Sequence, residues 1–95
     1  MIIYVDIDNT ICATEGDDYE GALPIQENID KINKLYDEEH TIVYWTGRGS
    51  GSGIDWRNLT LAQLIHWGCK HHELKMGKPV YDLFIEDRSK RIEEI

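Results

Sequence analysis

Residues 2–10 read Ile2-Ile3-Tyr4-Val5-Asp6-Ile7-Asp8-Asn9-Thr10, an apolar, β-favouring run that leads directly into two aspartates. Such a run predicts a strand of a covered sheet, with Asp6 and Asp8 at its carboxyl end. In open α/β sheets, ligands bind in the crevice outside that end, so both carboxylates are placed for chemistry. Two like charges this close favour a hard cation such as Mg²⁺, which binds carboxylate oxygens, waters and substrate phosphate oxygens.

Other proteins also use the pattern Asp-x-Asp. A calcium-binding loop has glycine at its sixth position and glutamate at its twelfth, whereas this chain has Ile11 and Asp17 there. A polar turn after a strand is a further interpretation of the short motif, because Asp and Asn are common in turns. The choice between a turn and a site therefore depends on the later residues.

Length and charge limit the classes of protein to be considered. The 95 residues suit one small domain, which we expect to span residues 1–95. Eighteen acidic and ten basic residues give a formal charge of −8, which argues against a general nucleic-acid binder and against charge-driven membrane binding. Without a signal-peptide pattern or a spanning helix, a cytoplasmic protein is expected. Cys12 and Cys69 form no CxxC pair and are interpreted as reduced, buried thiols.

The next part of the chain predicts a strand–helix–strand unit. Residues 11–23 show no sustained period and predict a loop or hairpin. Pro24 suits a first helical turn, and the apolar residues after it predict an amphipathic helix to about Glu39. Residues 41–45 predict a second strand. The unit is therefore βαβ, with a parallel sheet and a right-handed crossover.

The second strand leads into Thr46-Gly47-Arg48 and then a glycine-rich segment, residues 49–53. It is not a P-loop, since no Gly-Lys-Ser/Thr follows, and the spacing does not fit the dinucleotide fingerprint. Thr46 would stand beside Asp6, where its hydroxyl and the following amides could bind phosphate oxygens. Residues 49–53 are a plain connection, or residues 48–53 form a mobile flap over the site. Arg48 would either contact substrate oxygens or form a salt bridge to the acidic rim.

The last part of the chain predicts one helix and one further strand. Asp55 is the expected N-cap of a helix to Trp67. A zinc site at residues 71–73 is disfavoured, because adjacent histidines point different ways and no third ligand is suitably spaced. Residues 83–85 predict a strand that brings Glu86 and Asp87 to its carboxyl end.

Three parallel strands would then end in Asp6 and Asp8, in Thr46, and in the acidic pair at residues 86–87, with Lys78 shortly before the last strand. This convergence favours a site over three unrelated turns. The predicted sheet order is last strand, first, second, and a short strand near residues 73–76, so that the Asp6 strand is central.

Together, residues 6–10, residues 46–48, Lys78 and residues 86–87 resemble the four motifs of the haloacid dehalogenase superfamily, in order along the whole chain. The stretch from Gly77 to Ser89 is similar to small capless phosphatases of capsule and surface-polysaccharide biosynthesis. The resemblance implies a three-layer α/β sandwich with a Rossmann-like parallel sheet. Residues 9–24 are too few for the cap domain that the superfamily usually inserts, so the resemblance is to a capless core.

The resemblance also implies roles for individual residues. Asp6 would be the nucleophile that forms an aspartyl-phosphate, and Asp8 the acid and then the base. Mg²⁺ would be held by Asp6, the Asp8 carbonyl and Asp87, with Glu86 as a further candidate because it stands where the superfamily usually has aspartate. The phosphoryl oxygens would be bound by Thr46, Gly47, Arg48 and Lys78, with Lys75 as the alternative lysine.

The expected function is thus a Mg²⁺-dependent phosphomonoester phosphatase that acts on a small sugar phosphate or related metabolite. One alternative is a phosphatase of nucleic-acid or nucleotide phosphates, since an uncapped site admits polymers. Another is a non-catalytic phosphate-binding module, because fold alone does not determine function. The expected partner is a small phosphorylated substrate rather than nucleic acid or membrane, and a homo-oligomer is left open.

Overall fold

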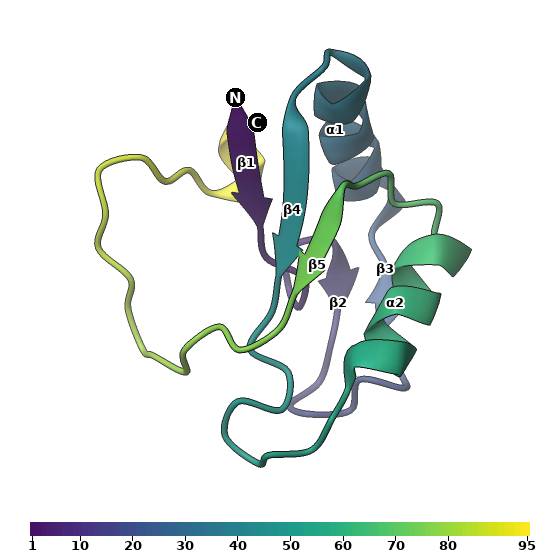
Figure 1. Ribbon diagram of the computed structural model, residues 1–95, viewed down its shortest axis with the longest axis vertical. Coiled ribbons are helices and arrows are strands. Elements are labelled where there is room, and N and C mark those ends of the chain that lie inside the picture. The colour runs from purple at the N-terminus through teal and green to yellow at the C-terminus, as the bar shows by residue number, and fades with distance from the viewer.

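The computed structural model describes residues 1–95 and contains a parallel sheet with helices packed against it (Figure 1). The sheet has three strands in the order β1 (Ile2–Val5), β4 (Thr41–Trp45) and β5 (Glu73–Lys75). All neighbouring strands in it are parallel. The prediction of an α/β fold with a parallel sheet is confirmed, as is the short strand expected near residues 73–76.

The segment between the first two sheet strands forms a small hairpin and a helix. In the hairpin, β2 (Cys12–Ala13) pairs antiparallel with β3 (Leu23–Pro24). The helix α1 (Gln26–Asp37) buries Ile29 and Ile32, as its apolar period predicts. Pro24 lies in β3 rather than in the first helical turn, because the hairpin continues one residue further than the sequence pattern indicates.

The second helix, α2 (Arg57–His66), follows the glycine-rich segment. The N-cap position is Trp56 rather than the expected Asp55. Asp55 lies one residue earlier, where its carboxylate accepts a hydrogen bond of 3.0 Å from the Arg57 amide. The chain ends in a short 3₁₀ helix, η1 (Ile92–Glu94). No helix in the structure has the length and apolar character needed to cross a membrane.

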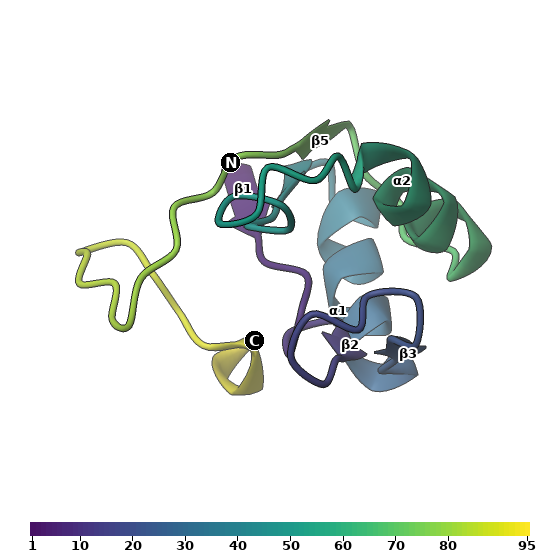
Figure 2. The ribbon, with the colours of Figure 1, turned by 90° about the horizontal axis from the view of Figure 1, so that it is seen from below.

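One hydrophobic core lies between the sheet and the two helices. Figure 2 shows α1 and α2 on the same side of the sheet. Alternate strand residues point to this side, since side chains alternate along a strand. The buried residues that make up most of the core come from every layer: Val5, Ile7, Ile11, Ile29, Ile32, Ile42, Tyr44, Leu64 and Leu74.

The opposite face of the sheet is covered by no helix. Ile2 on this face is 71% exposed, and the Tyr4 ring packs edge-on against Trp45 with ring centroids 5.7 Å apart. A three-layer sandwich needs helices on both faces, and the helices of this chain cover one. The α/β class is therefore established for the chain, without the third layer.

The predicted strand at residues 83–85 is not formed, and the predicted sheet order is wrong. Residues 79–91 are all exposed and arc away from the sheet in Figures 1 and 2. As a result β1 is an edge strand rather than the central one. The physical reason is the short connection from β5, because only residues 76–82 precede the predicted strand, whereas parallel strands need a crossover of about a dozen residues or more.

Candidate active site

A pocket of about 260 Å³ opens at the carboxyl ends of β1 and β4. This is the edge of a parallel sheet where ligands commonly bind. It brings together most of the side chains that the sequence analysis singled out, from three separate parts of the chain. The residues that line it are Asp6, Asp8, Tyr19, Thr46, Gly47, Arg48, Lys78, Pro79, Val80 and Tyr81.

Asp6 presents a partly open carboxylate to this pocket. Its side chain is 41% exposed, and one oxygen lies 3.5 Å from the Lys78 Nζ. The Thr10 hydroxyl donates to the other oxygen over 3.5 Å. Asp6 is therefore accessible to a ligand and lies next to a positive charge.

Lys78, rather than Lys75, is the lysine that reaches the pocket. The Lys78 amide donates to the Thr46 carbonyl over 3.0 Å, which ties this lysine to the end of β4. Lys75 instead donates to the Tyr4 hydroxyl on the uncovered face of the sheet, over 2.8 Å. Burial acts to lower the pKa of the Lys78 amine, but the Tyr81 hydroxyl and the Asp6 carboxylate outweigh it and raise the pKa. Lys78 is thus firmly cationic.

Asp8 differs from Asp6 because its carboxylate is paired with Arg48. Arg48 donates through Nε to one Asp8 oxygen over 3.0 Å and through Nη2 to the other over 2.8 Å. The Thr14 hydroxyl donates to Asp8 over 2.6 Å. The paired hydrogen bonds from Arg48 to the two Asp8 oxygens are the strong, bidentate form of an arginine–carboxylate contact.

These contacts keep Asp8 ionised. Burial alone would raise the pKa of Asp8, but hydrogen bonds from Arg48 and Thr14, together with the charge of Arg48, lower it below its ordinary value. The neighbouring Cys12 thiol has a pKa raised mainly by burial. In the free protein, Asp8 is therefore a carboxylate that accepts protons weakly.

Four of the five N–H donors of Arg48 are bonded within the chain. Its side chain is fully buried, and Nη1 donates to the Thr60 hydroxyl and to the Gln63 carbonyl oxygen. Its guanidinium also lies 4.8 Å from the centroid of the Tyr19 ring. Of the two roles that the sequence left open for Arg48, the structure shows the salt bridge, and contact with substrate oxygens stays a prediction.

Thr46 and Gly47 form the floor of the pocket. The buried Thr46 hydroxyl accepts a hydrogen bond of 3.1 Å from the Arg48 amide. The Gly47 amide donates to no acceptor within the chain. A Cβ at Gly47 would lie 3.2 Å from the Lys78 carbonyl oxygen, so glycine allows the two segments to approach closely. The free amide is a donor that a phosphate oxygen could use.

Glu86 and Asp87 lie outside the pocket. The Asp87 side chain is 84% exposed, and its only ion pair, 3.9 Å long, is with the adjacent Arg88. Glu86 accepts a hydrogen bond from the Arg88 amide. No group of three or more His, Cys, Asp or Glu side chains is arranged to hold a metal ion. Within one chain, Glu86 and Asp87 are therefore not brought to Asp6 and Asp8.

The glycine-rich segment is anchored rather than free. Ser50 donates to the Lys78 carbonyl over 2.7 Å, and the Gly53 amide donates to the Gly49 carbonyl over 2.8 Å. Gly49 has a φ of 83°, and a Cβ there would overlap the Ile54 carbonyl oxygen. At least one glycine of this segment is therefore required by packing, independently of any motion over the site.

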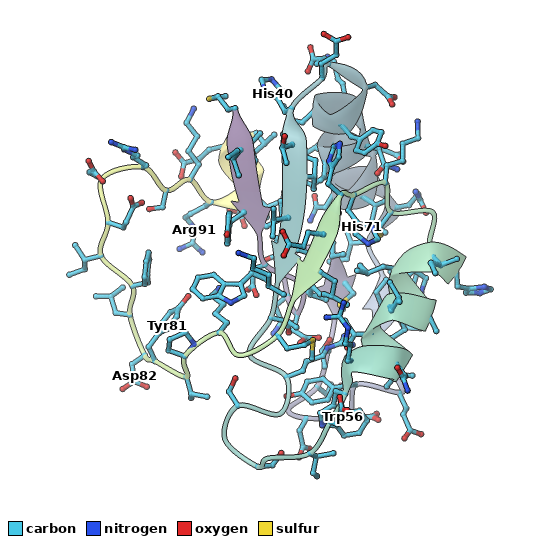
Figure 3. The ribbon with its side chains drawn as sticks, viewed as in Figure 1. His40, Trp56, His71, Tyr81, Asp82 and Arg91 are labelled. Carbon is cyan, nitrogen blue, oxygen red and sulfur yellow. The ribbon has the colours of Figure 1, made fainter.

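The two adjacent histidines have structural contacts. His72 Nδ1 accepts a hydrogen bond of 3.1 Å from the Ile42 amide, and its ring stacks on Tyr36. His71, labelled in Figure 3, packs edge-on against Tyr44 and lies two residues before β5. The two rings face different parts of the molecule.

Several residues that shape the site were not indicated by the sequence. Thr14 contacts Asp8 from the hairpin, and Tyr19 lines the pocket. Gln63 on α2 links Arg48 to Tyr19. Its side-chain oxygen accepts a hydrogen bond from Arg48, and its side-chain nitrogen donates to the Tyr19 carbonyl over 2.6 Å. No motif or spacing marks these residues, because their contacts arise only when the hairpin, α2 and the end of β4 meet.

Comparison with known proteins supports the fold. No protein-family model matches the sequence, and no curated protein sequence matches it. Among solved structures, a crystal structure of a structural-genomics target from Vibrio cholerae is similar, with a TM-score of 0.87 and 24% sequence identity. The match covers 99% of this chain and 86% of that one. At this identity the likeness concerns the fold alone.

Proposed function

We propose that the protein is a magnesium-dependent phosphatase of small phosphomonoesters, such as a sugar phosphate or related metabolite, that works through an aspartyl-phosphate. The fold that goes with this proposal is the capless core of the haloacid dehalogenase superfamily, to which the four motifs have a resemblance. The observation that carries the proposal is the open Asp6 carboxylate beside the Lys78 ammonium, 3.5 Å away, in a pocket with Thr46 and Gly47.

The first step is attack by an Asp6 oxygen on phosphorus. The bond from phosphorus to the ester oxygen breaks as the new bond forms, and the ester oxygen leaves with a proton from Asp8. Water then attacks the aspartyl-phosphate and gives its proton to Asp8, which releases phosphate and restores Asp6. Lys78 and the Gly47 amide stabilise the negative charge on the transferring oxygens.

The ion pair of Asp8 with Arg48 adds a requirement to this mechanism. Asp8 must carry a proton when the ester oxygen leaves, yet Arg48 lowers its pKa in the free protein. A phosphate dianion in the pocket adds negative charge next to Asp8, and a nearby like charge raises the pKa of a carboxyl group. We propose that the bound substrate itself prepares Asp8 as the acid.

The experiment is release of inorganic phosphate from a panel of phosphorylated metabolites, with and without Mg²⁺. We expect Mg²⁺-dependent turnover of at least one small phosphate ester, lost in Asp6→Asn. The asparagine keeps the shape of the side chain but cannot attack phosphorus. Normal turnover by Asp6→Asn would exclude an aspartyl-phosphate mechanism.

A phosphate-binding module without catalysis is the second candidate. The observation that favours it is the tight pairing of Asp8 with Arg48, which leaves the free protein without a ready acid. Such a module would bind inorganic phosphate through Lys78 and Gly47 and would release no phosphate from any ester. Nucleic-acid phosphates are less favoured than small esters, because the net charge of −8 repels a polyanion.

A further inference from the structure

Residues 79–91, called the arm below, expose an apolar segment that the rest of the chain leaves uncovered. Leu83 is 75% exposed and Ile85 is 87% exposed. In an extended chain these two side chains share one face, because side chains alternate along a strand. An exposed apolar run of this kind commonly marks a site of protein–protein contact.

The arm is not a loose end, because its own chain holds it on both sides. Before it, Lys78 is bonded to Thr46 and to Ser50. After it, the Ile92 carbonyl accepts a hydrogen bond of 3.3 Å from Lys31, and the Ile92 side chain packs against the core. The arm therefore arcs outward between two fixed points. Tyr81 and Asp82 lie in its first part, and Arg91 ends it (Figure 3).

The surface next to the arm is an unpaired sheet edge. β1 pairs with β4 on one side only, so the backbone groups on its other side have no strand to bond to. Ile2 and Tyr4 are exposed on the uncovered face beside this edge. An extended apolar segment could pair with the edge and cover these side chains at the same time.

The arm cannot pair in parallel with β1 of its own chain, which is the direction that would bring Asp87 to Asp6. Lys78 is at the carboxyl end of β1, so residues 79–82 would have to run back along the strand and reverse direction before residues 83–85 could pair in parallel. Four extended residues span about 14 Å, which is about the length of β1 and leaves nothing for the turns. Antiparallel pairing is feasible, but it would put Asp87 at the amino end of β1, far from Asp6.

We propose that the arm of one copy pairs in parallel with β1 of a second copy and delivers Asp87 to that copy's Asp6 and Asp8. The limit on connection length does not apply between chains. A two-fold exchange gives each copy one donated arm and one covered edge. The metal role of Asp87 rests on the proposed function. Asp6 of one chain and Asp87 of the other would then hold the magnesium ion together.

The first test is the mass of the protein in solution, measured by light scattering after size-exclusion chromatography. We expect a dimer for the wild-type chain and a monomer for Ile85→Asp, since a charge in the paired strand would be buried without a partner. Ile65→Asp is the matched control, because Ile65 is also an exposed isoleucine, at 68%, but lies on α2. A monomeric wild type, or a dimer unaffected by Ile85→Asp, would overturn the exchange.

The second test separates donation between copies from action within one chain. Asp6→Asn and Asp87→Ala chains carry different affinity tags, are co-expressed, and the mixed dimer is purified. In that dimer one of the two sites has both an intact Asp6 and an intact donated Asp87, so about half of wild-type activity should return. The control dimer of Asp6→Asn with Asp8→Asn should stay inactive, because each of its sites lacks one of the two aspartates that follow β1.

Calorimetric titration with Mg²⁺ makes this test independent of turnover. We expect Mg²⁺ binding to fall in each single variant and to return at one site of the Asp6→Asn/Asp87→Ala dimer. If the wild type binds Mg²⁺ but hydrolyses no ester, the phosphatase proposal fails while the exchange survives. Full activity or full Mg²⁺ binding in Asp87→Ala alone, or no recovery in the mixed dimer, would overturn donation by the arm.

Discussion

Asp6 and Asp8 lie two residues apart, yet they have different partners, and this difference governs how each should respond to substitution. Asp6 is partly exposed and faces Lys78 at 3.5 Å. Asp8 accepts two hydrogen bonds from the fully buried Arg48 side chain. A buried charge that loses its partner is costly, whereas an exposed pair contributes little.

We therefore predict that Asp8→Asn destabilises the protein by about 3 kcal/mol, because it leaves the Arg48 guanidinium buried without a counter-charge. Asp6→Asn, the matched control, should change the free energy of unfolding by less than about 1 kcal/mol. Urea denaturation of the two variants measures the difference. Equal losses of stability would mean that the Arg48–Asp8 pair does not support the fold.

The lowered pKa of Asp8 also predicts a dependence on pH. Its pKa is lower in the folded protein than in the unfolded chain, so the unfolded state takes up a proton first as pH falls. The stabilising contribution of Asp8 should be fully present above its unfolded pKa of about 4 and be lost as pH falls through the folded value. Urea denaturation of wild type and Asp8→Asn between pH 7 and pH 3 should show the two curves converging at low pH. Parallel curves would contradict this role of Asp8.

The two candidate lysines give a further prediction. Lys78→Met should lower kcat/KM about a hundredfold or more, because it removes the positive charge next to Asp6. Lys75→Met should have little effect on turnover, since Lys75 contacts Tyr4 on the uncovered face of the sheet. Steady-state kinetics on the same phosphate ester compares them. The reverse order would mean that Lys75 is the phosphate-binding residue.

At the scale of elements, the segment after β4 combines two requirements. It must position the Arg48 side chain so that it contacts Asp8. It must also pack against the turn before α2. Gly49 meets the second requirement with a φ of 83° and a close approach to the Ile54 carbonyl. Gly51 has only the Val80 side chain near its Cβ position, at 4.0 Å.

We predict that Gly49→Ala destabilises the protein by about 2 kcal/mol or more and lowers activity, because the new methyl group overlaps backbone in a strained conformation. Gly51→Ala should leave stability unchanged to within about 0.5 kcal/mol. If this segment also acts as a flap, Gly51→Ala should still lower kcat/KM for the native substrate. Equal stability of the two variants would show that the segment tolerates a side chain at Gly49.

At the scale of the whole molecule, the single core contains both cysteines. Burial raises the pKa of the Cys69 thiol to about 11 and also raises that of Cys12. Thiolates are the reactive form of cysteine, so neither residue should react readily in the folded state.

We predict that a thiol reagent at pH 8 modifies neither cysteine in the native protein and both in denaturant. The rate under native conditions should follow the opening of the core, since both side chains are buried. Destabilised variants such as Asp8→Asn should therefore react faster. Rapid labelling of the stable wild type would show that the core around Cys12 or Cys69 is open to solvent.

Local patterns in the sequence determined β1, α1 and β4, together with the meeting of Asp6 and Thr46 at one sheet edge. Apolar periods and the ends of consecutive parallel strands are properties of short segments, which is why sequence alone predicts them. The same patterns suggested a strand at residues 83–85, because apolar character is a property of the segment itself. Whether the connection is long enough for parallel pairing depends instead on where the other strands lie, which the local pattern does not contain.

Only the tertiary structure decided that β1 lies at an edge, that Lys78 and not Lys75 faces Asp6, and that Arg48 pairs with Asp8. Each of these depends on where separate segments meet. Arg48 is 40 residues from Asp8 along the chain, and its contacts with Thr60 and Gln63 exist only after α2 has packed beside the hairpin. The position of Asp87 was also decided only by the tertiary structure. Connection length and sheet order, rather than residue type, keep this carboxylate away from the site of its own chain.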